Sequence, residues 1–167
     1  RAFPPGSCQL AEFQVVVHEI ASRLLTSATD SFKRLKVKPE QVFLCDNESQ
    51  NAAIDTCTHD LFFSRGLIAS LLNAPEMRDG SMSIDALAGI IAHELGHAAF
   101  QQNFNARGNS MLQEEWCDKQ AATMMERAGF KPEAMTLAWE MINRTSRFES
   151  SIQVLNHGQV HASIPIR

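Results

Sequence analysis

Apolar positions spaced three or four residues apart predict most of the regular structure of this chain. From Leu10 this spacing predicts an amphipathic helix that ends near Asp30. The same spacing predicts four more helices, at residues 65–74, 83–102, 111–128 and 132–147. Ser83 is a residue type that caps helix starts, Gly129 suits a helix end, and Pro132 suits a first helical turn.

Two segments rich in β-branched and aromatic residues predict strands instead. They are residues 41–46 and 54–64, and a turn-rich connector at 47–53 joins them. Several helices and a small sheet in one short chain indicate an α+β fold that is mostly helical. With 167 residues the chain has the size of one domain, which we place at residues 1–167.

The helix expected at 83–102 carries polar groups in its most apolar part, AGIIAHELGHAAF. His93 and His97 are four residues apart, so a helix places both imidazoles on one face, one turn apart. This spacing suits two ligands of one tetrahedral Zn²⁺, and Glu94 can reach a water bound to the ion. The pattern predicts a metal-dependent hydrolase with one zinc ion per chain. Gly96 weakens a helix, which indicates that another segment packs close to its backbone.

A catalytic zinc takes a third protein ligand and keeps one position for water. Glu114 and Asp118 are four residues apart on the next expected helix, so they share a face with apolar residues. We expect Glu114 to be the third ligand and Asp118 to accept a hydrogen bond from a ligand imidazole. Glu115 is the rival ligand, although it points about 100° away from Glu114.

Composition narrows the range of partners. The net charge of −4 gives no electrostatic reason to expect nucleic acid. No apolar run approaches the roughly 18–20 residues of a membrane span. The four cysteines form no Cys-x-x-Cys pattern, which speaks against a cysteine zinc site. Cys45 and Cys57 fall in the two expected strands, where they form either a disulfide or two free thiols.

Four stretches that follow one another along nearly the whole chain carry a joint pattern. They are NAAI…FFSRGLI (51–68), HELGH (93–97), EEWCD…ERAGFKP (114–132) and VHASIPIR (160–167). Together they resemble the gluzincin metallopeptidases of the HtpX and CAAX-prenyl-endopeptidase family, in particular its small soluble, BepA-like members. The chain departs from that family where Cys117 replaces the alanine of E-x-x-A-D and where IDTCTHD stands in place of L-P-G-G.

The resemblance implies a zincin-like minimal catalytic domain whose sheet has its edge strand beside the active-site cleft. It makes Glu114 the third ligand and Asp118 a supporting carboxylate, and it places the edge strand at residues 58–63. An extended peptide would add to that strand through main-chain hydrogen bonds. The residues expected to contact the substrate are therefore His59, Asp60, Leu61, Phe62 and Phe63.

These observations predict a zinc endopeptidase that cleaves extended or unfolded protein segments, with Glu94 activating a zinc-bound water as general base. The chain has no tyrosine to stabilise the oxyanion. We expect His161, which matches the histidine of the final family motif, to donate to it, with Arg167 or His157 behind it. Alternatively, His161 is a fourth zinc ligand and the site is latent. The alternative function is a latent or non-catalytic zinc domain that binds client proteins like a chaperone.

The expected location is outside the cytoplasm, for example in the periplasm. A disulfide between Cys45 and Cys57, a first residue other than methionine and the BepA-like resemblance favour it. The expected partner is a protein or peptide substrate, and the sequence does not indicate an oligomeric state.

Overall fold

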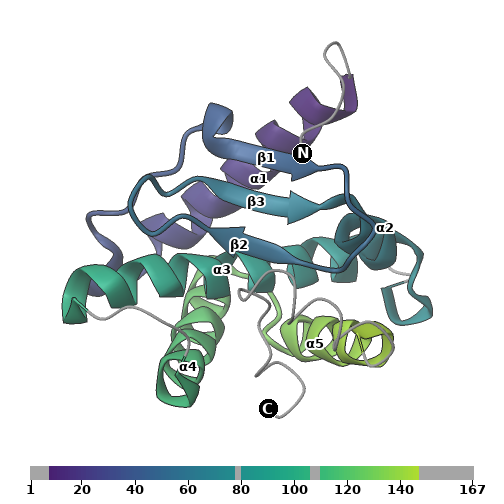
Figure 1. Ribbon diagram of the computed structural model, residues 1–167. Helices are drawn as coiled ribbons and strands as arrows, with labels where there is room; N and C mark the ends of the chain where they lie inside the picture. Colours follow the sequence, from purple (N-terminus) through teal and green to yellow (C-terminus); the bar gives the residue numbers. More distant parts are fainter. Residues whose placement is uncertain (1–7, 78–79, 106–109, 147–167) are drawn as a thin grey trace.

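The computed structural model describes residues 8–77, 80–105 and 110–146 (Figure 1). Within them the chain forms α-helices, short 3-10 turns and one small sheet, which confirms the α+β class expected from the sequence. The helices and strands are α1 (Cys8–Thr26), β1 (Val42–Cys45), β2 (Ala52–Ile54), β3 (Leu61–Ser64), α2 (Arg65–Asn73), α3 (Gly80–Phe104), α4 (Met111–Ala128) and α5 (Glu133–Ser146). The helix predictions are confirmed to within a few residues at most ends.

The sheet has the strand order β1-β3-β2, with β1 parallel and β2 antiparallel to β3. One face is buried, because Leu61 and Phe63 of β3 lie in the hydrophobic core beside Val42 and Leu44 of β1. Phe62 points to the other face, where its ring stacks on Phe43 at 5.2 Å between centroids. Successive side chains of β3 therefore point to opposite faces of the sheet, as in any β-strand.

The prediction of one strand over residues 54–64 is wrong, because a turn divides this segment into β2 and β3. The Asp55 carboxylate accepts hydrogen bonds from the backbone N–H groups of Cys57 and Thr58, at 2.8 and 3.0 Å. Such a side-chain turn competes with continued pairing of the backbone. The edge-strand prediction fails with it, since β3 lies in the middle of the sheet and β2 lies at the edge.

The backbone hydrogen bonds show which groups of β2 face away from β3. Ser64 N–H donates to the Asn51 carbonyl and Asp55 N–H donates to the Asp60 carbonyl, both at 2.9 Å. Because pairing alternates along an antiparallel ladder, the intervening Ala53 also faces β3. The N–H and carbonyl groups of Ala52 and Ile54 therefore point to the outer side of the sheet.

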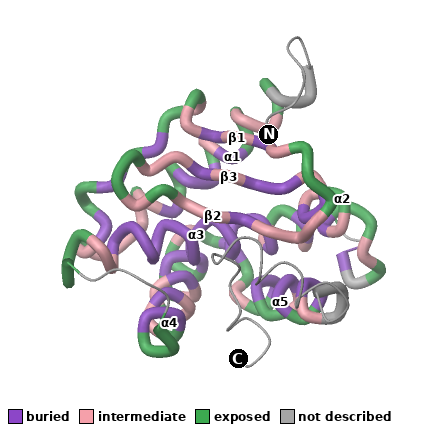
Figure 2. Tube along the Cα trace, viewed as in Figure 1, coloured by how far each residue is buried: buried purple, intermediate pink, exposed green. Residues whose placement is uncertain are grey.

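Helix α3 runs through the centre of the molecule, with the sheet on one side of it and α4 and α5 on the other (Figure 1). Every residue from 86 to 99 is buried, as the continuous burial along α3 in Figure 2 shows. A helix that is buried all round can only carry polar side chains that find partners inside the protein. None of the described helices combines the length and the apolarity that crossing a membrane requires.

One local expectation is corrected, one open alternative is decided and one expectation is confirmed. Ser83 does not cap α3, because it lies inside the helix and its hydroxyl donates to the carbonyl groups of Leu71 and Met77, both at 3.1 Å. The Cys45–Cys57 disulfide is absent, since both residues are free thiols. That pair therefore gives no support to a location outside the cytoplasm. Gly129 ends α4 in the left-handed conformation, at φ 87°, as expected.

Candidate metal centre

Three buried side chains from two helices meet at one point between α3 and α4. Nε2 of His93 lies 3.2 Å from Nε2 of His97, and the two nitrogens lie 3.1 and 3.3 Å from the carboxylate oxygens of Glu114. The exposed fractions of His93 and Glu114 are 0%, and that of His97 is 5%. The helical spacing of the two histidines and the position of Glu114 on α4 thus bring all three groups together.

These separations fit ligands arranged around a single metal ion. Zinc binds histidine nitrogen at about 2.0–2.1 Å and carboxylate oxygen at about 2.0–2.2 Å, so two ligands at the tetrahedral angle lie roughly 3.3 Å apart. The three contacts among His93, His97 and Glu114 measure 3.1–3.3 Å. The donor set of two imidazoles and one carboxylate is also the set that zinc takes in catalytic sites with one open position.

Hydrogen bonding alone accounts less well for this cluster. Each Nε2 carries at most one hydrogen, so hydrogens can bridge only two of the three contacts among His93, His97 and Glu114. The remaining contact then brings two like groups to about van der Waals distance without attraction. A cation shared by the three groups would attract all three of them at once.

Both imidazoles are held from behind by residues of α4. Nδ1 of His93 lies 2.8 Å from a carboxylate oxygen of Asp118, the residue expected to support a ligand imidazole. Nδ1 of His97 lies 3.0 Å from the side-chain amide nitrogen, Nε2, of Gln113, which is itself buried. A proton on Nδ1 leaves Nε2 free to bind a metal, and the carboxylate of Asp118 favours that tautomer. The carboxamide of Gln113 favours the same tautomer of His97 when its oxygen, in place of its nitrogen, faces Nδ1.

Sequence reasoning missed Gln113. It precedes Glu114 directly and lies in the first turn of α4, after Ser110, whose hydroxyl accepts a hydrogen bond from its N–H at 3.1 Å. The burial of Gln113 beside a buried histidine would have indicated its role. The sequence does not show this burial, because it depends on how α3 and α4 cross. The rival ligand Glu115 is exposed.

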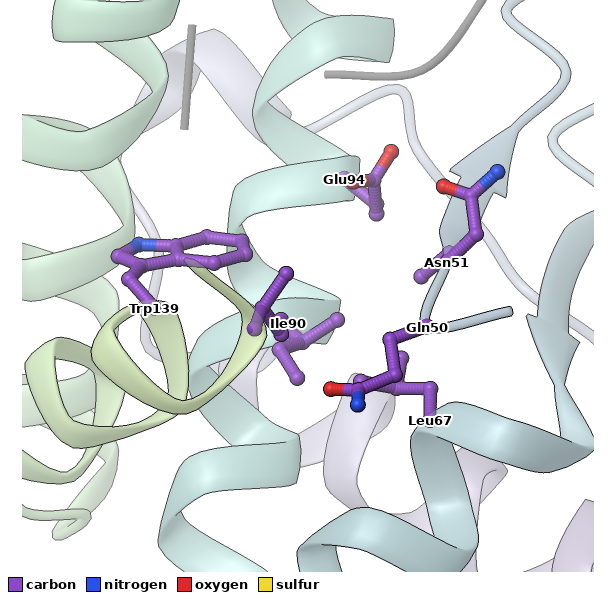
Figure 3. A pocket seen from close by; sticks show the side chains of 8 residues that line it. Gln50, Asn51, Leu67, Ile90, Glu94 and Trp139 are labelled. Atoms are coloured by element: carbon purple, nitrogen blue, oxygen red, sulfur yellow. The ribbon is translucent and has the colours of Figure 1, made fainter. Parts of the chain in front are cut away.

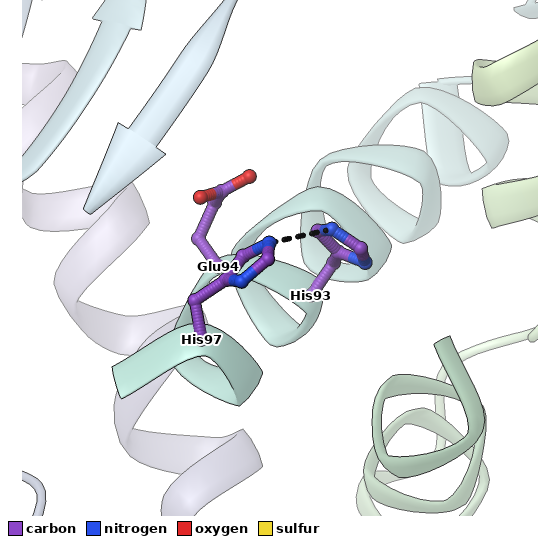
Figure 4. A group of neighbouring side chains, drawn as sticks. All are labelled: His93, Glu94 and His97. Carbon is purple, nitrogen blue, oxygen red and sulfur yellow. Dashed lines mark hydrogen bonds between the residues drawn. The ribbon is translucent and has the colours of Figure 1, made fainter. Parts of the chain in front are cut away.

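Glu94 lies next to the cluster without being its closest carboxylate. Ligand atoms of His93, Glu94 and His97 all lie within 4.8 Å of one another, so these three groups could also hold an ion. In Figure 4 the two imidazoles face each other, and the carboxylate of Glu94 rises from the same stretch of helix beside them. Glu114 has the better claim to be the third ligand, because its oxygens lie within 3.3 Å of both Nε2 atoms.

Close contact between α3 and α4 explains the glycine in the histidine motif. A methyl group added at Gly96 would lie 3.1–3.2 Å from atoms of Cys117. This confirms the expectation that another segment packs against the backbone at Gly96. Cys117 is fully buried at this contact, as cysteine side chains in a packed core often are.

A small cavity opens beside Glu94 (Figure 3). It holds about 230 Å³ of space, part of it open solvent, and Gln50, Asn51 and Ala52 border it on the side of β2. Its other walls come from three helices and consist of Leu67, Ile90, Trp139 and Ile142. The indole of Trp139 also packs edge-on against the imidazole of His93, with 5.1 Å between ring centroids.

The residues expected to contact the substrate lie elsewhere. Leu61 and Phe63 are buried in the core, and Phe62 faces the opposite side of the sheet from them. Asp60 contacts Gln41 at 3.3 Å, and the ring of His59 contacts the Gln102 side chain of α3 at 3.2 Å. None of these five lines the cavity, and sequence reasoning missed the segment that does, residues 50–52.

Two turn residues have shifted pKa values. Backbone hydrogen bonds from Thr58 and then Cys57 lower the pKa of the Asp55 carboxyl. Burial lowers the pKa of His59, which has the left-handed φ of 67° that non-glycine residues seldom adopt. Neither group belongs to the metal cluster. Both lie in the β2–β3 turn, so their pKa values depend on the structure of that turn.

Some predicted groups cannot be placed. His157, His161 and Arg167 lie outside the described residues, and so does the side chain of Cys8. No protein-family model matches the chain, and no curated protein matches it either. The resemblance to gluzincin peptidases and the roles of the individual residues therefore remain predictions.

Proposed function

We propose that the protein is a zinc-dependent endopeptidase of the gluzincin type that hydrolyses peptide bonds in extended or unfolded protein segments. The observation that carries this proposal is the buried cluster of His93, His97 and Glu114, with Glu94 beside it. A bound zinc ion would polarise the scissile carbonyl and make water a stronger acid. A site that served structure alone would have no use for a second buried carboxylate next to the three ligands.

Glu94 has the position of a general base. Glu94 is 2% exposed, and it borders both the metal cluster and the cavity. In this proposal Glu94 takes a proton from the attacking water and returns it to the leaving amine. In this proposal Asp118 accepts a hydrogen bond from Nδ1 of His93, and Gln113 accepts one from Nδ1 of His97 once its carboxamide oxygen faces the ring, so that both Nε2 lone pairs point to the ion.

The outer side of β2 offers the main-chain groups that an extended substrate needs. Ala52 and Ile54 present N–H and carbonyl groups away from β3, and among the described strands β2 pairs with β3 alone. An added strand can therefore form two pairs of hydrogen bonds along β2, next to Glu94. This reading replaces residues 58–63 with residues 50–54 as the substrate-binding segment. His161 stays our candidate for the oxyanion donor.

Cleavage of denatured casein by the zinc-loaded protein tests the proposal. We expect Glu94→Gln to keep the zinc and to lose activity by about 10²–10⁴-fold, because the general base is removed and the ligands stay. Glu115→Gln is the matched control, since it makes the same change at an exposed position of α4 and should keep full activity. A chelator should abolish cleavage by both active proteins.

Two outcomes would contradict the peptidase proposal. One is cleavage by Glu94→Gln at the wild-type rate, and the other is cleavage that persists without metal. Binding of denatured protein with no cleavage by any variant would favour the alternative, a zinc domain that binds clients.

A further inference from the structure

Large apolar side chains are exposed where α3 ends and α4 begins. Phe104, the last residue of α3, is 54% exposed, and Met111 and Leu112, in the first turn of α4, are 48% and 76% exposed. The ring of Phe104 packs edge-on against Trp116, with 5.7 Å between centroids. Leu112 lies one turn before Trp116 on the same face of α4. Trp116 thus joins both helix ends into one surface, the apolar end, which consists of Phe104, Met111 and Leu112.

The segment that follows α1 carries a run of basic side chains. Its exposed cations are Lys33, Arg34, Lys36 and Lys38. Leu35 and Val37 alternate with them and are buried in the core, so the segment is held in place while its cations face solvent. None of the four cations forms an ion pair with a described residue. Their charge is therefore available to a partner.

Packing places this basic segment beside the apolar end. The side-chain amide of Asn103, one residue before the end of α3, donates to the carbonyl of Ser31 at 2.9 Å. The ring of Phe32 stacks on Trp116, with 6.2 Å between centroids, and the basic run begins at the next residue. Figure 1 shows the loop after α1 next to the C-terminal end of α3. Exposed apolar groups and a row of cations therefore share one end of the molecule.

The acidic groups nearby do not cancel this positive charge. Asp30 and Glu40 lie on either side of the basic run, and four cations stand between them. Glu115, which follows Leu112 on α4, is accompanied one turn later by Lys119. This end is thus positively charged, although the whole chain has a net charge of −4. An anionic partner would be attracted to it and repelled by much of the remaining surface.

We propose that this end of the molecule binds the surface of a bilayer that contains anionic phospholipids. Basic side chains beside exposed Phe, Leu and Trp are the combination with which proteins rest on such membranes. The apolar end would enter the boundary of the acyl chains, while Lys33 and Lys36 would contact lipid phosphates. Lysine is depleted in protein–protein interfaces, which favours lipid over an acidic protein as the partner.

The proposed contact is peripheral and independent of the peptidase proposal. None of the described helices could cross a membrane, so the protein would touch one leaflet only. The residues that carry the inference belong neither to the metal cluster nor to the cavity beside Glu94. Binding can therefore be measured without any cleavage, and the absence of hydrolysis would leave this inference unaffected.

Flotation of the full chain with vesicles tests the inference. One set of vesicles contains phosphatidylcholine alone, and the other contains equal parts of phosphatidylcholine and phosphatidylglycerol. At about 0.1 M salt we expect at least tenfold stronger partitioning to the anionic vesicles. Higher salt should weaken that binding, because it screens the attraction between the cations and the lipid phosphates.

A pair of charge variants locates the binding surface. Lys33→Gln combined with Lys36→Gln should weaken partitioning to anionic vesicles by about tenfold or more, since each cation near the surface contributes separately. The matched control is Arg127→Gln combined with Lys131→Gln, which removes the same charge beyond the opposite end of α4. This control should bind like the wild type.

A pair of leucine variants tests the apolar contribution. Leu112→Ser should weaken partitioning by about threefold to tenfold, because a side chain that enters the bilayer is lost. Leu72→Ser is the matched control, since Leu72 is similarly exposed on α2, which Figure 1 shows far from the C-terminal end of α3. Circular dichroism of all variants verifies that they are folded.

Three results would overturn the inference. They are equal binding to both kinds of vesicle, unchanged binding of the Lys33 and Lys36 double variant, and equal losses in the Leu112 and Leu72 variants. Polyglutamate is the probe for the other class of partner. Binding to polyglutamate without binding to anionic vesicles would also contradict the lipid assignment, and it would assign this surface to an acidic protein segment.

Discussion

At the scale of single residues, the two ligand imidazoles are oriented by different partners. His93 meets a carboxylate, Asp118, which is partly exposed, and His97 meets an amide, Gln113, which is buried. Both partners come from α4, the helix that also carries Glu114. In the proposed site, one helix thus supplies the third ligand and the groups that hold the other two in place.

We expect Gln113→Leu to weaken zinc binding by about 10–100-fold, because Nδ1 of His97 loses the partner that fixes its tautomer and ring orientation. Competition with a chromogenic chelator measures the affinity. Gln113→Glu is the control, since it keeps an oxygen that can accept from Nδ1 and should retain most of the affinity. Zinc affinity of the leucine variant equal to that of the wild type would refute this role.

Residues whose relation follows from helix geometry were predictable from sequence. His93, Glu94 and His97 lie on one helical stretch, and the four-residue spacing alone determines that the imidazoles adjoin. Gln113 and Trp139 were not predictable, because their contacts depend on how α4 and α5 cross α3. That Glu114 lies beside both imidazoles was predicted from two sources, the face it shares with Asp118 on one helix and the family resemblance.

At the scale of elements, the loop before β2 is fixed to α2 by one glycine. An added methyl at Gly66 would lie 2.0 Å from the carbonyl oxygen of Glu48, and Gly66 N–H donates to the carbonyl of Asn47 at 2.9 Å. This contact sets the path of residues 47–50, which lead directly into β2. The cavity residue Gln50 therefore owes its position to the close approach at Gly66.

We predict that Gly66→Ala lowers the free energy of unfolding by about 1–3 kcal/mol, because the methyl group forces backbone to move apart from backbone. Urea denaturation measures the change. Gly80→Ala is the matched control, since a methyl group there meets nothing within 4 Å. If both variants are as stable as the wild type, the close approach at Gly66 is not a constraint.

The β2–β3 turn gives the molecule a defined response to acid. Because hydrogen bonds lower the pKa of Asp55 in the folded protein, its stabilising effect is complete above the pKa of the unfolded chain and is lost as pH falls through the folded value. Asp55→Asn keeps an acceptor oxygen but does not titrate. The difference in unfolding free energy between wild type and Asp55→Asn should therefore shrink from pH 6 towards pH 2.5. A difference that is independent of pH would contradict this prediction.

The helices were predicted more accurately than the sheet for a physical reason. Helix ends depend on local groups such as Ser110 and Gly129, which cap α4 within a few bonds along the chain. The division of residues 54–64 depends on the turn at Asp55 and on pairing with a distant strand. Strand order is a property of tertiary packing, so a local pattern could not place β3 in the middle of the sheet.

At the scale of the whole molecule, the site exists only in the folded chain. The residues proposed as ligands come from α3 and α4, the cavity walls come from α2, α3 and α5, and the edge proposed to bind substrate is β2. The central position of α3 between the sheet and the last two helices brings these elements together (Figure 1). We therefore expect metal binding to be coupled to folding.

The central claim is that one zinc ion is bound by His93, His97 and Glu114. X-ray absorption at the zinc edge, on protein loaded with one equivalent of zinc, tests it most directly. We predict four nitrogen or oxygen ligands at about 2.0–2.1 Å, with the outer-shell signature of two imidazoles. A sulfur shell at about 2.3 Å, which would point to Cys117 or another thiol, or failure of the folded protein to retain zinc, would contradict the account.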